Sequence, residues 1–183
     1  RFPYLGAPGG PFDAVDDPEV RIIYLQFGIR MGKTLFGQMT TLFYADVAPY
    51  NMLFASVTKQ LAEQVAERTT EMAAACPRLS HQLPREELRN KHEVQFDNCR
   101  IYVGWFRSDA TLADKDVLIG HGNEIDKLVQ VQTATEGDPL ERFIDRASNK
   151  PRHKYILEST PQRRNHSRVE AGRLASTNCS FHV

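Results

Sequence analysis

The residues best suited to chemistry lie in one short segment, residues 28–34, which sits between a predicted strand and a predicted helix. They are, in order, Gly28, Ile29, Arg30, Met31, Gly32, Lys33 and Thr34. A loop that leads into a helix directs unpaired backbone N–H groups at one point, and the helix dipole adds partial positive charge there. The segment therefore predicts a phosphate-binding loop for a nucleotide such as ATP.

Each polar residue of this loop has an expected role. Gly32 lets the backbone pass close to the phosphates, Lys33 reaches the β and γ oxygens, and the Thr34 hydroxyl ligates Mg²⁺. Arg30 is a second cation, which either stabilises or senses the γ-phosphate or is simply solvated. The usual pattern has glycine six residues before the lysine, whereas Phe27 stands there in this chain. The alternative is an ordinary strand-to-helix turn with a surface lysine.

A second polar group follows a later predicted strand. Hydrolysis of ATP needs a base that orients water and a metal-side ligand, and both are expected at the carboxyl ends of parallel strands. Glu124 is the predicted base, and Asn123 is predicted at the metal. Because an asparagine brings no negative charge, we expect weaker metal binding and turnover unless Asp126 or another carboxylate compensates. His121, between two glycines, is predicted to be a loop histidine, and an ordinary turn is the alternative for the whole group.

The elements that position these residues alternate between strand and helix. Short apolar runs predict buried strands, longer stretches without proline predict helices, and an Asp-Asn turn predicts a hairpin. The expected strands are 22–27, 51–57, 116–119 and 155–157, the helices 33–47 and 59–75, and the hairpin 93–103. The first twenty residues are expected to form a loop. The fold class predicted is α/β, a P-loop NTPase of the RecA/ASCE-like kind, with mostly parallel core strands flanked by helices, plus the β-hairpin.

Composition limits the function classes. The 183 residues are 41% hydrophobic and carry 23 basic and 23 acidic residues, so a packed core is affordable and a wholly basic nucleic-acid coat is excluded. No apolar run approaches the roughly 18 residues of a membrane span, so no membrane partner is expected. Three dispersed cysteines disfavour a disulfide scaffold or zinc ribbon. We expect a single domain over residues 1–183, which is a fragment of a longer chain.

Basic residues are concentrated between positions 146 and 173, where eight lysines and arginines face two glutamates. Such a segment can neutralise DNA phosphates without recognising sequence. Arg163, Arg164 and Arg168 are the candidate DNA contacts, and a solvated loop is the alternative.

Several segments occur in the same order as in one protein family. Residues 28–34, Gly-His-Gly-Asn-Glu-Ile at 120–125 and Glu-Ser-Thr-Pro at 158–161 together resemble the ATPase domain of the large terminase subunit of tailed bacteriophages, in its lambda-like branch. Residues 167–170 and 180–183 are also similar to that family. Residues 3–5 resemble its adenine-contacting segment, which implies that Tyr4 contacts the nucleotide.

The resemblance implies a motor that uses ATP and Mg²⁺ to drive viral DNA into a preformed capsid in the host cell cytoplasm. It implies double-stranded DNA, the small terminase subunit and the portal of the procapsid as partners, and a homo-oligomeric ring. It also implies that Ser159 and Thr160 couple hydrolysis to movement, and that a nuclease domain follows residue 183. The alternatives are another P-loop nucleic-acid motor, such as a helicase, or a nucleotide-binding assembly module with weak or no hydrolysis, which Asn123 would favour.

Overall fold

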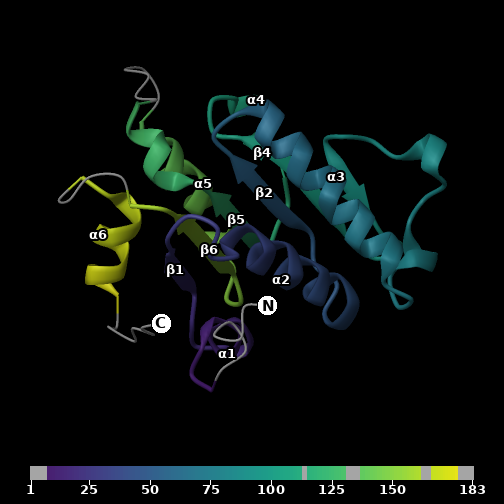
Figure 1. The fold of residues 1–183 in the computed structure, drawn as a ribbon, viewed down its shortest axis with the longest axis horizontal. Coiled ribbons are helices and arrows are strands. Elements are labelled where there is room, and N and C mark those ends of the chain that lie inside the picture. Colours follow the sequence, from purple (N-terminus) through teal and green to yellow (C-terminus); the bar gives the residue numbers. More distant parts are fainter. Residues whose placement is uncertain (1–7, 113–114, 131–136, 162–165, 177–183) are drawn as a thin grey trace.

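A computed structural model describes residues 8–112, 115–130, 137–161 and 166–176 of the chain. Its centre is a six-stranded sheet (Figure 1). The strands are β1 (Ile22–Gln26), β2 (Met52–Ser56), β3 (Glu93–Gln95), β4 (Arg100–Trp105), β5 (Ile119–Asn123) and β6 (Lys154–Ser159). Their order across the sheet is β1-β6-β5-β2-β4-β3, so the strands that precede the two predicted polar groups are separated only by β6.

Neighbouring strands are parallel throughout, except for the antiparallel pair β3 and β4. That pair is the predicted hairpin, and its turn is closed by a 2.9 Å hydrogen bond from the Phe96 N–H to the Cys99 carbonyl. The predicted α/β fold class is therefore confirmed. Because the parallel strands point the same way, Gln26, Ser56, Asn123 and Ser159 end at one edge of the sheet.

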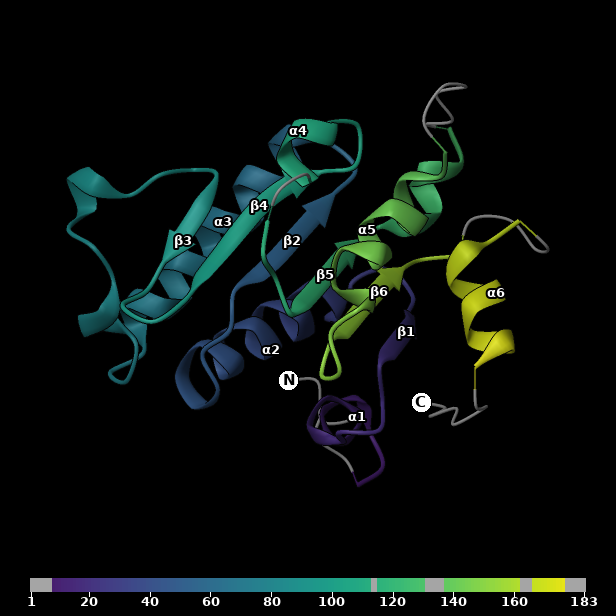
Figure 2. The same cartoon turned by 180° about the vertical axis from the view of Figure 1, so that it is seen from behind.

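Helices cover both faces of the sheet (Figures 1 and 2). One face carries α2 (Lys33–Val47) and α3 (Lys59–Ala75), and the other carries α5 (Pro139–Ser148) and α6 (Arg168–Ala175). The remaining short elements are α1 (Pro11–Asp16), α4 (Asp109–Leu112), η2 (Ser80–Gln82), η3 (Glu86–Leu88) and η4 (Ile125–Gln130). No helix among the described residues is both long and apolar enough to cross a bilayer.

The core strands are buried on both faces, as their continuous apolar sequences predict. In β2, Met52 and Phe54 pack into the cluster beneath α2 and α3, whereas Leu53 and Ala55 join the opposite cluster with Phe143 of α5. Each fully buried large side chain stabilises the fold by about 1.5–3 kcal/mol. These two cores fix the sheet between its helices and hold the carboxyl edge in place.

The prediction of the third core strand at 116–119 was wrong, because β5 lies at Ile119–Asn123. Glycines weaken a strand, so the Gly-His-Gly sequence suggested a turn. In the fold, a Cβ at position 120 would overlap the ring of Tyr155, so the glycine allows β6 to pack closely beside β5. His121 is accordingly a buried strand residue, and the expectation of a loop histidine was also wrong.

The expectation of a loop over the first twenty residues failed at α1. This six-residue helix begins with Pro11, which has a suitable φ for a first turn, and it follows Gly10. Its carboxyl end is held by the buried ammonium group of Lys154, which donates to the carbonyls of Ala14 and Asp17. Such tertiary support is not visible in a short sequence window.

Candidate active site

The predicted phosphate loop joins β1 to α2 at the carboxyl edge of the sheet. Gly32 is the residue before the helix and has left-handed backbone geometry, with φ of 79°, which glycine adopts at little cost. Its carbonyl accepts the first helical hydrogen bond from the Phe36 N–H at 2.8 Å. The first turn of α2 contains no acidic residue, so the positive end of the helix dipole is not neutralised by its own helix.

The exposed part of this loop comprises Gly28, Ile29 and Arg30. Arg30 has a φ of 60°, a left-handed conformation that is uncommon outside glycine, asparagine and aspartate. Holding such a residue costs on the order of 1–3 kcal/mol, and strain of this kind is often found at ligand sites. The conformation leaves the guanidinium on the exposed loop, beside the start of α2.

Lys33 and Glu124 are adjacent in space, although they are far apart in the sequence. The Lys33 ammonium lies 3.3 Å from Glu124 Oε1, and the two side chains are only 9% and 18% exposed. The other carboxylate oxygen, Oε2, lies 3.5 Å from the more exposed ammonium of Lys127. The structure therefore brings the predicted phosphate-binding lysine and the predicted base into one ion-pair network at the end of β5.

Glu124 also has an unusual backbone. Its φ is 58°, and its carbonyl accepts a 3.0 Å hydrogen bond from the Lys127 N–H as η4 begins. The left-handed residue turns the chain sharply out of β5, so that the carboxylate faces the loop before α2 instead of continuing along the strand. The strained conformation is thus maintained by η4 and by the ion pair with Lys33.

Asn123 and Thr34 are the two predicted metal-side residues, and they also meet. The Asn123 amide donates to Thr34 Oγ1 at 3.4 Å, and Asn123 is 5% exposed. No cluster of three or more His, Cys, Asp or Glu side chains suited to a metal occurs in the part of the chain that the structure describes. Hydroxyl and amide oxygens suit Mg²⁺, which commonly binds through few protein ligands together with substrate phosphates. The donor set therefore fits a magnesium–nucleotide complex better than a free ion.

Asp126 does not join this metal-side pair. Its Oδ1 accepts a 2.9 Å hydrogen bond from the Val169 N–H at the start of α6, and the residue is 2% exposed. The possibility that Asp126 compensates for Asn123 is therefore not supported. Glu124 is the carboxylate that the structure places at Lys33.

Ser159 ends β6, between the two halves of the site. Its carbonyl accepts from the Phe27 N–H at 3.2 Å, and its hydroxyl accepts from the Asp126 N–H at 3.2 Å. It therefore contacts both the chain entering the phosphate loop and the chain leaving Glu124. Thr160 follows directly, outside the strand, and its carbonyl accepts from the Ser159 hydroxyl at 3.4 Å.

A buried polar pair behind the site was missed by the sequence analysis. His121 Nε2 lies 3.0 Å from Glu158 Oε1, and the residues are 3% and 0% exposed. The imidazole packs directly under α2, where a Cβ at Gly37 would overlap the ring. Gly37, two glycines beside His121 and a glutamate within an apolar strand were the available signals, but only the parallel pairing of β5 and β6 brings the polar groups together.

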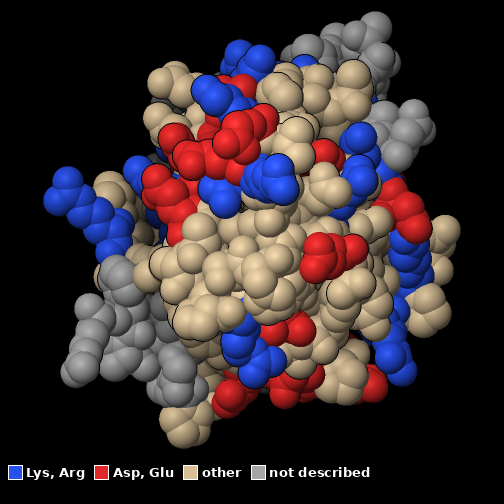
Figure 3. All heavy atoms as spheres, turned by 90° about the vertical axis from the view of Figure 1, so that its right-hand side faces the viewer, with Lys and Arg blue, Asp and Glu red and all other residues tan. Residues whose placement is uncertain are grey.

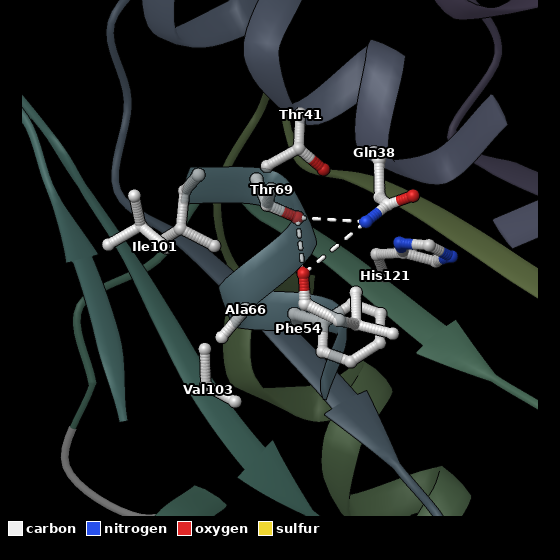
Figure 4. A pocket seen from close by; sticks show the side chains of 10 residues that line it. Gln38, Thr41, Phe54, Ala66, Thr69, Ile101, Val103 and His121 are labelled. Carbon is white, nitrogen blue, oxygen red and sulfur yellow. Dashed lines mark hydrogen bonds between the residues drawn. The ribbon is translucent and has the colours of Figure 1, made fainter. Parts of the chain in front are cut away.

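Figure 4 shows a hollow beside His121, between the sheet and the helices α2 and α3. Gln38 points across it and donates to the Thr69 hydroxyl and the Val65 carbonyl, both at 3.3 Å. The remaining lining is mostly apolar, and the volume is about 10 Å³. This holds about one water molecule at most and is far too small for a nucleotide, so the hollow is a packing gap.

The predicted DNA contacts are only partly within the described residues. Arg163 and Arg164, together with the predicted adenine contact Tyr4, lie outside them. Arg168 forms an ion pair with Asp138, and its side chain is 18% exposed. A free cation at Arg168 is therefore not supported, because a phosphate would have to displace Asp138.

The wider basic segment is likewise not one continuous surface. Lys150 pairs with Asp116, Lys154 is buried against α1, and Arg173 donates to the Gln26 side chain at 2.8 Å. These contacts stabilise the packing of the chain and reduce the number of positive charges available to a polyanion.

The side of the molecule drawn in Figure 3 is also unsuited to phosphates. Acidic side chains gather there, with basic side chains beside them. A groove of about 590 Å³ lies between α3 and the segment around η3. Its charged lining residues are Glu63, Glu67, Glu71, Glu86, Arg89 and Lys91. Four carboxylates against two cations disfavour DNA in this groove.

Taken together, the parallel sheet, the left-handed glycine before Lys33-Thr34 and the carboxylate that reaches that lysine from a nearby strand define the class: a P-loop NTPase domain. Residues 1–183 match the family model described as phage terminase large subunit gpA, ATPase domain. The chain belongs to this family.

Solved structures agree with the fold. The large terminase of bacteriophage HK97 is similar with a TM-score of 0.71 and 14% identity, over 91% of this chain and 36% of that chain. The large terminase of a thermophilic bacteriophage, in complex with ADP, gives 0.55 and 14%, over 86% and 36%. The UvsW helicase of bacteriophage T4 gives 0.54 and 15%, over 87% and 54%. No curated protein matches the sequence significantly.

Proposed function

We propose that this chain is the ATP-hydrolysing motor domain of a terminase that packages DNA, and that Lys33 and Glu124 act at its catalytic centre. The observation that carries the proposal is the 3.3 Å approach of Lys33 Nζ to Glu124 Oε1, in a domain whose family is named for its ATPase activity. A base must lie near the γ-phosphate, and the lysine that binds this phosphate marks the position.

Nucleotide binding falls to the loop and to the start of α2. The unpaired N–H groups of the first turn and the Lys33 ammonium bind the phosphate oxygens, and Arg30 adds a second positive charge from the exposed loop. Thr34 and Asn123 would hold Mg²⁺, which neutralises phosphate charge when bound. Tyr4 is the proposed adenine contact.

The ion pair suggests how the base is brought into use. A phosphate that approaches Lys33 competes with Glu124 for the ammonium group, because both are anions on the same cation. The carboxylate is then available to orient a water molecule and accept its proton. Lys127, at 3.5 Å from the other oxygen, keeps Glu124 ionised and near the site during this exchange.

Coupling to movement is assigned to Ser159 and Thr160. Ser159 contacts Phe27 at the loop and Asp126 beyond Glu124, so a change at either position alters its hydrogen bonds. The segment that follows Thr160 contains Arg163 and Arg164, the proposed contacts to DNA phosphates, and leads to Arg168.

The wider assembly follows from membership of the terminase family. The chain spans about a third of the large terminases of HK97 and of the thermophilic bacteriophage. We propose that residues 1–183 form one domain of a longer chain whose nuclease domain follows. We further propose that it acts as a homo-oligomeric ring in the host cytoplasm, with double-stranded DNA, the small terminase subunit and the portal of the procapsid.

Glu124→Gln in the full-length chain tests the proposal. We expect ATP turnover to fall by about 10²–10⁴-fold while nucleotide binding persists, because the amide cannot accept the proton. Glu71→Gln, the same change on the exposed face of α3, is the control and should leave turnover unaltered. Undiminished turnover by Glu124→Gln would dismiss Glu124 as the base.

The second candidate is a helicase, which the structural likeness to UvsW favours. The two are separated by strand displacement: a packaging motor consumes ATP on intact duplex DNA without producing single strands. An assembly module without hydrolysis, which Asn123 favours, is identified by nucleotide binding without any turnover.

A further inference from the structure

We infer that Asp126 is a positioning residue that links the nucleotide site to α6 by holding both ends of the segment between Ser159 and Val169. The inference rests on the proposed function, because it concerns how a change at Glu124 reaches the segment that contains Arg163 and Arg164. Two hydrogen bonds from this one buried residue carry it.

The first hydrogen bond holds the start of the segment. The Asp126 N–H donates to Ser159 Oγ at 3.2 Å, and both residues are almost completely buried. A backbone donor moves only with its chain, so this contact reports the position of the chain directly after Glu124. Ile125, between Glu124 and Asp126, is 0% exposed and leaves little room for independent movement.

The second hydrogen bond holds the end of the segment. Asp126 Oδ1 accepts from the Val169 N–H at 2.9 Å, at the amino end of α6, where a carboxylate also interacts favourably with the helix dipole. Val169 is 0% exposed. Among the described residues, Asp126 Oδ2 is buried without a hydrogen-bond partner, so the carboxylate is held at a desolvation cost that its α6 contact must offset.

The helix α6 is also attached to the strand that enters the phosphate loop. Gly172 packs so closely on Tyr24 of β1 that a Cβ would overlap the ring, and Arg173 Nε donates to Gln26 Oε1 at 2.8 Å. Thus α6 contacts β1 directly and contacts the chain after β5 through Asp126. A movement of Glu124 away from Lys33 changes the second contact while the first remains as a fixed point.

The test measures hydrogen exchange of the α6 amides in the full-length chain, with and without saturating ADP or a non-hydrolysable ATP analogue. Binding of each nucleotide is measured first by calorimetry. In the wild type we expect nucleotide to change the exchange of the Val169 amide by at least about fivefold, the effect of one ordinary hydrogen bond. Asp126→Ala should abolish this nucleotide dependence, while nucleotide affinity stays within about twofold. Asp126→Asn, which keeps an oxygen acceptor, should restore it.

Ser167→Ala is the matched control. Ser167 caps α6 by accepting from the Glu170 N–H at 3.1 Å, so its loss loosens the same helix end without touching Asp126. It should raise exchange in both states and preserve the nucleotide-dependent ratio. Should Asp126→Ala fail to fold, Ser159→Ala removes only the hydroxyl acceptor and should reduce the ratio.

Three outcomes overturn the inference alone: nucleotide binds the wild type without altering α6 exchange, Asp126→Ala keeps the ratio, or Ser167→Ala loses it equally. Absence of nucleotide binding by the wild type overturns the proposed function, and this inference with it.

Discussion

His121 and Glu158 form a hydrogen-bonded pair inside the sheet, with 3.0 Å between Nε2 and Oε1 and almost no exposure of either side chain. The pair joins β5 to β6 two residues before Asn123 and one before Ser159. The strands whose ends form the site are therefore connected by a polar contact as well as by their backbone ladder. A contact at this position helps to fix the spacing of the site residues.

The first prediction concerns this pair. Glu158→Leu should lower the free energy of unfolding by about 3–5 kcal/mol, because it leaves a buried imidazole without its partner. The double change His121→Leu with Glu158→Leu should cost clearly less than the sum of the two single changes. Urea unfolding followed by circular dichroism gives the coupling energy. Additive single effects would show that the contact contributes nothing specific.

The second prediction concerns Lys33. Lys33→Ala should weaken ATP binding by at least about tenfold, because one charge-assisted contact to phosphate contributes about 1.5–3 kcal/mol. Lys91→Ala, at an exposed position, is the control. Calorimetry with ATP and Mg²⁺ measures both. Equal affinity of wild type and Lys33→Ala would remove the phosphate-loop assignment.

The third prediction concerns Asn123. Asn123→Asp should raise ATP turnover and lower the Mg²⁺ concentration needed for half-maximal rate, because a carboxylate binds the metal more strongly than an amide. The Thr34 hydroxyl, now 3.4 Å from the amide nitrogen, can donate to the new carboxylate instead. Asn98→Asp, in the exposed hairpin turn, tests the added charge alone. Turnover that stays level or falls would indicate that Asn123 is not at the metal.

The site was largely predictable because its parts follow strand ends. Once 22–27 and the chain before Glu124 are assigned to parallel strands, Lys33 and Glu124 must reach the same edge, and the structure places them 3.3 Å apart. The apolar runs also identified β2 and the hairpin, since burial on both faces leaves a continuous hydrophobic sequence.

What escaped prediction depends on tertiary contacts. The extent of β5 was hidden because Gly120 serves a close approach to Tyr155 and has little strand propensity of its own. The pairing of His121 with Glu158 requires the register of β5 on β6, which one sequence does not specify. Arg168 looked like a free cation because Asp138 lies thirty positions earlier and meets it only in the fold.

The fourth prediction concerns Lys154, which is 6% exposed and donates to carbonyls at the end of α1, at 2.8 Å for Asp17 and 3.2 Å for Ala14. Lys154→Met should cost about 1–3 kcal/mol near neutral pH, because these carbonyls lose their donor. Burial lowers the pKa of Lys154 below 10.5, against the opposing effect of Asp17 and Asp16.

The sign of the pH dependence follows from that shift. Between the lowered folded pKa and 10.5, the unfolded chain binds the Lys154 proton more strongly than the folded chain, so the stability of the wild type rises with pH in this window. The methionine variant lacks this contribution, so the stability difference in favour of the wild type should widen as pH increases from about 8 to about 10.5. Urea titrations at several pH values measure it, with Lys91→Met as the exposed control. A difference that narrows with pH would show that the carbonyl contacts outweigh burial and hold the ammonium charged.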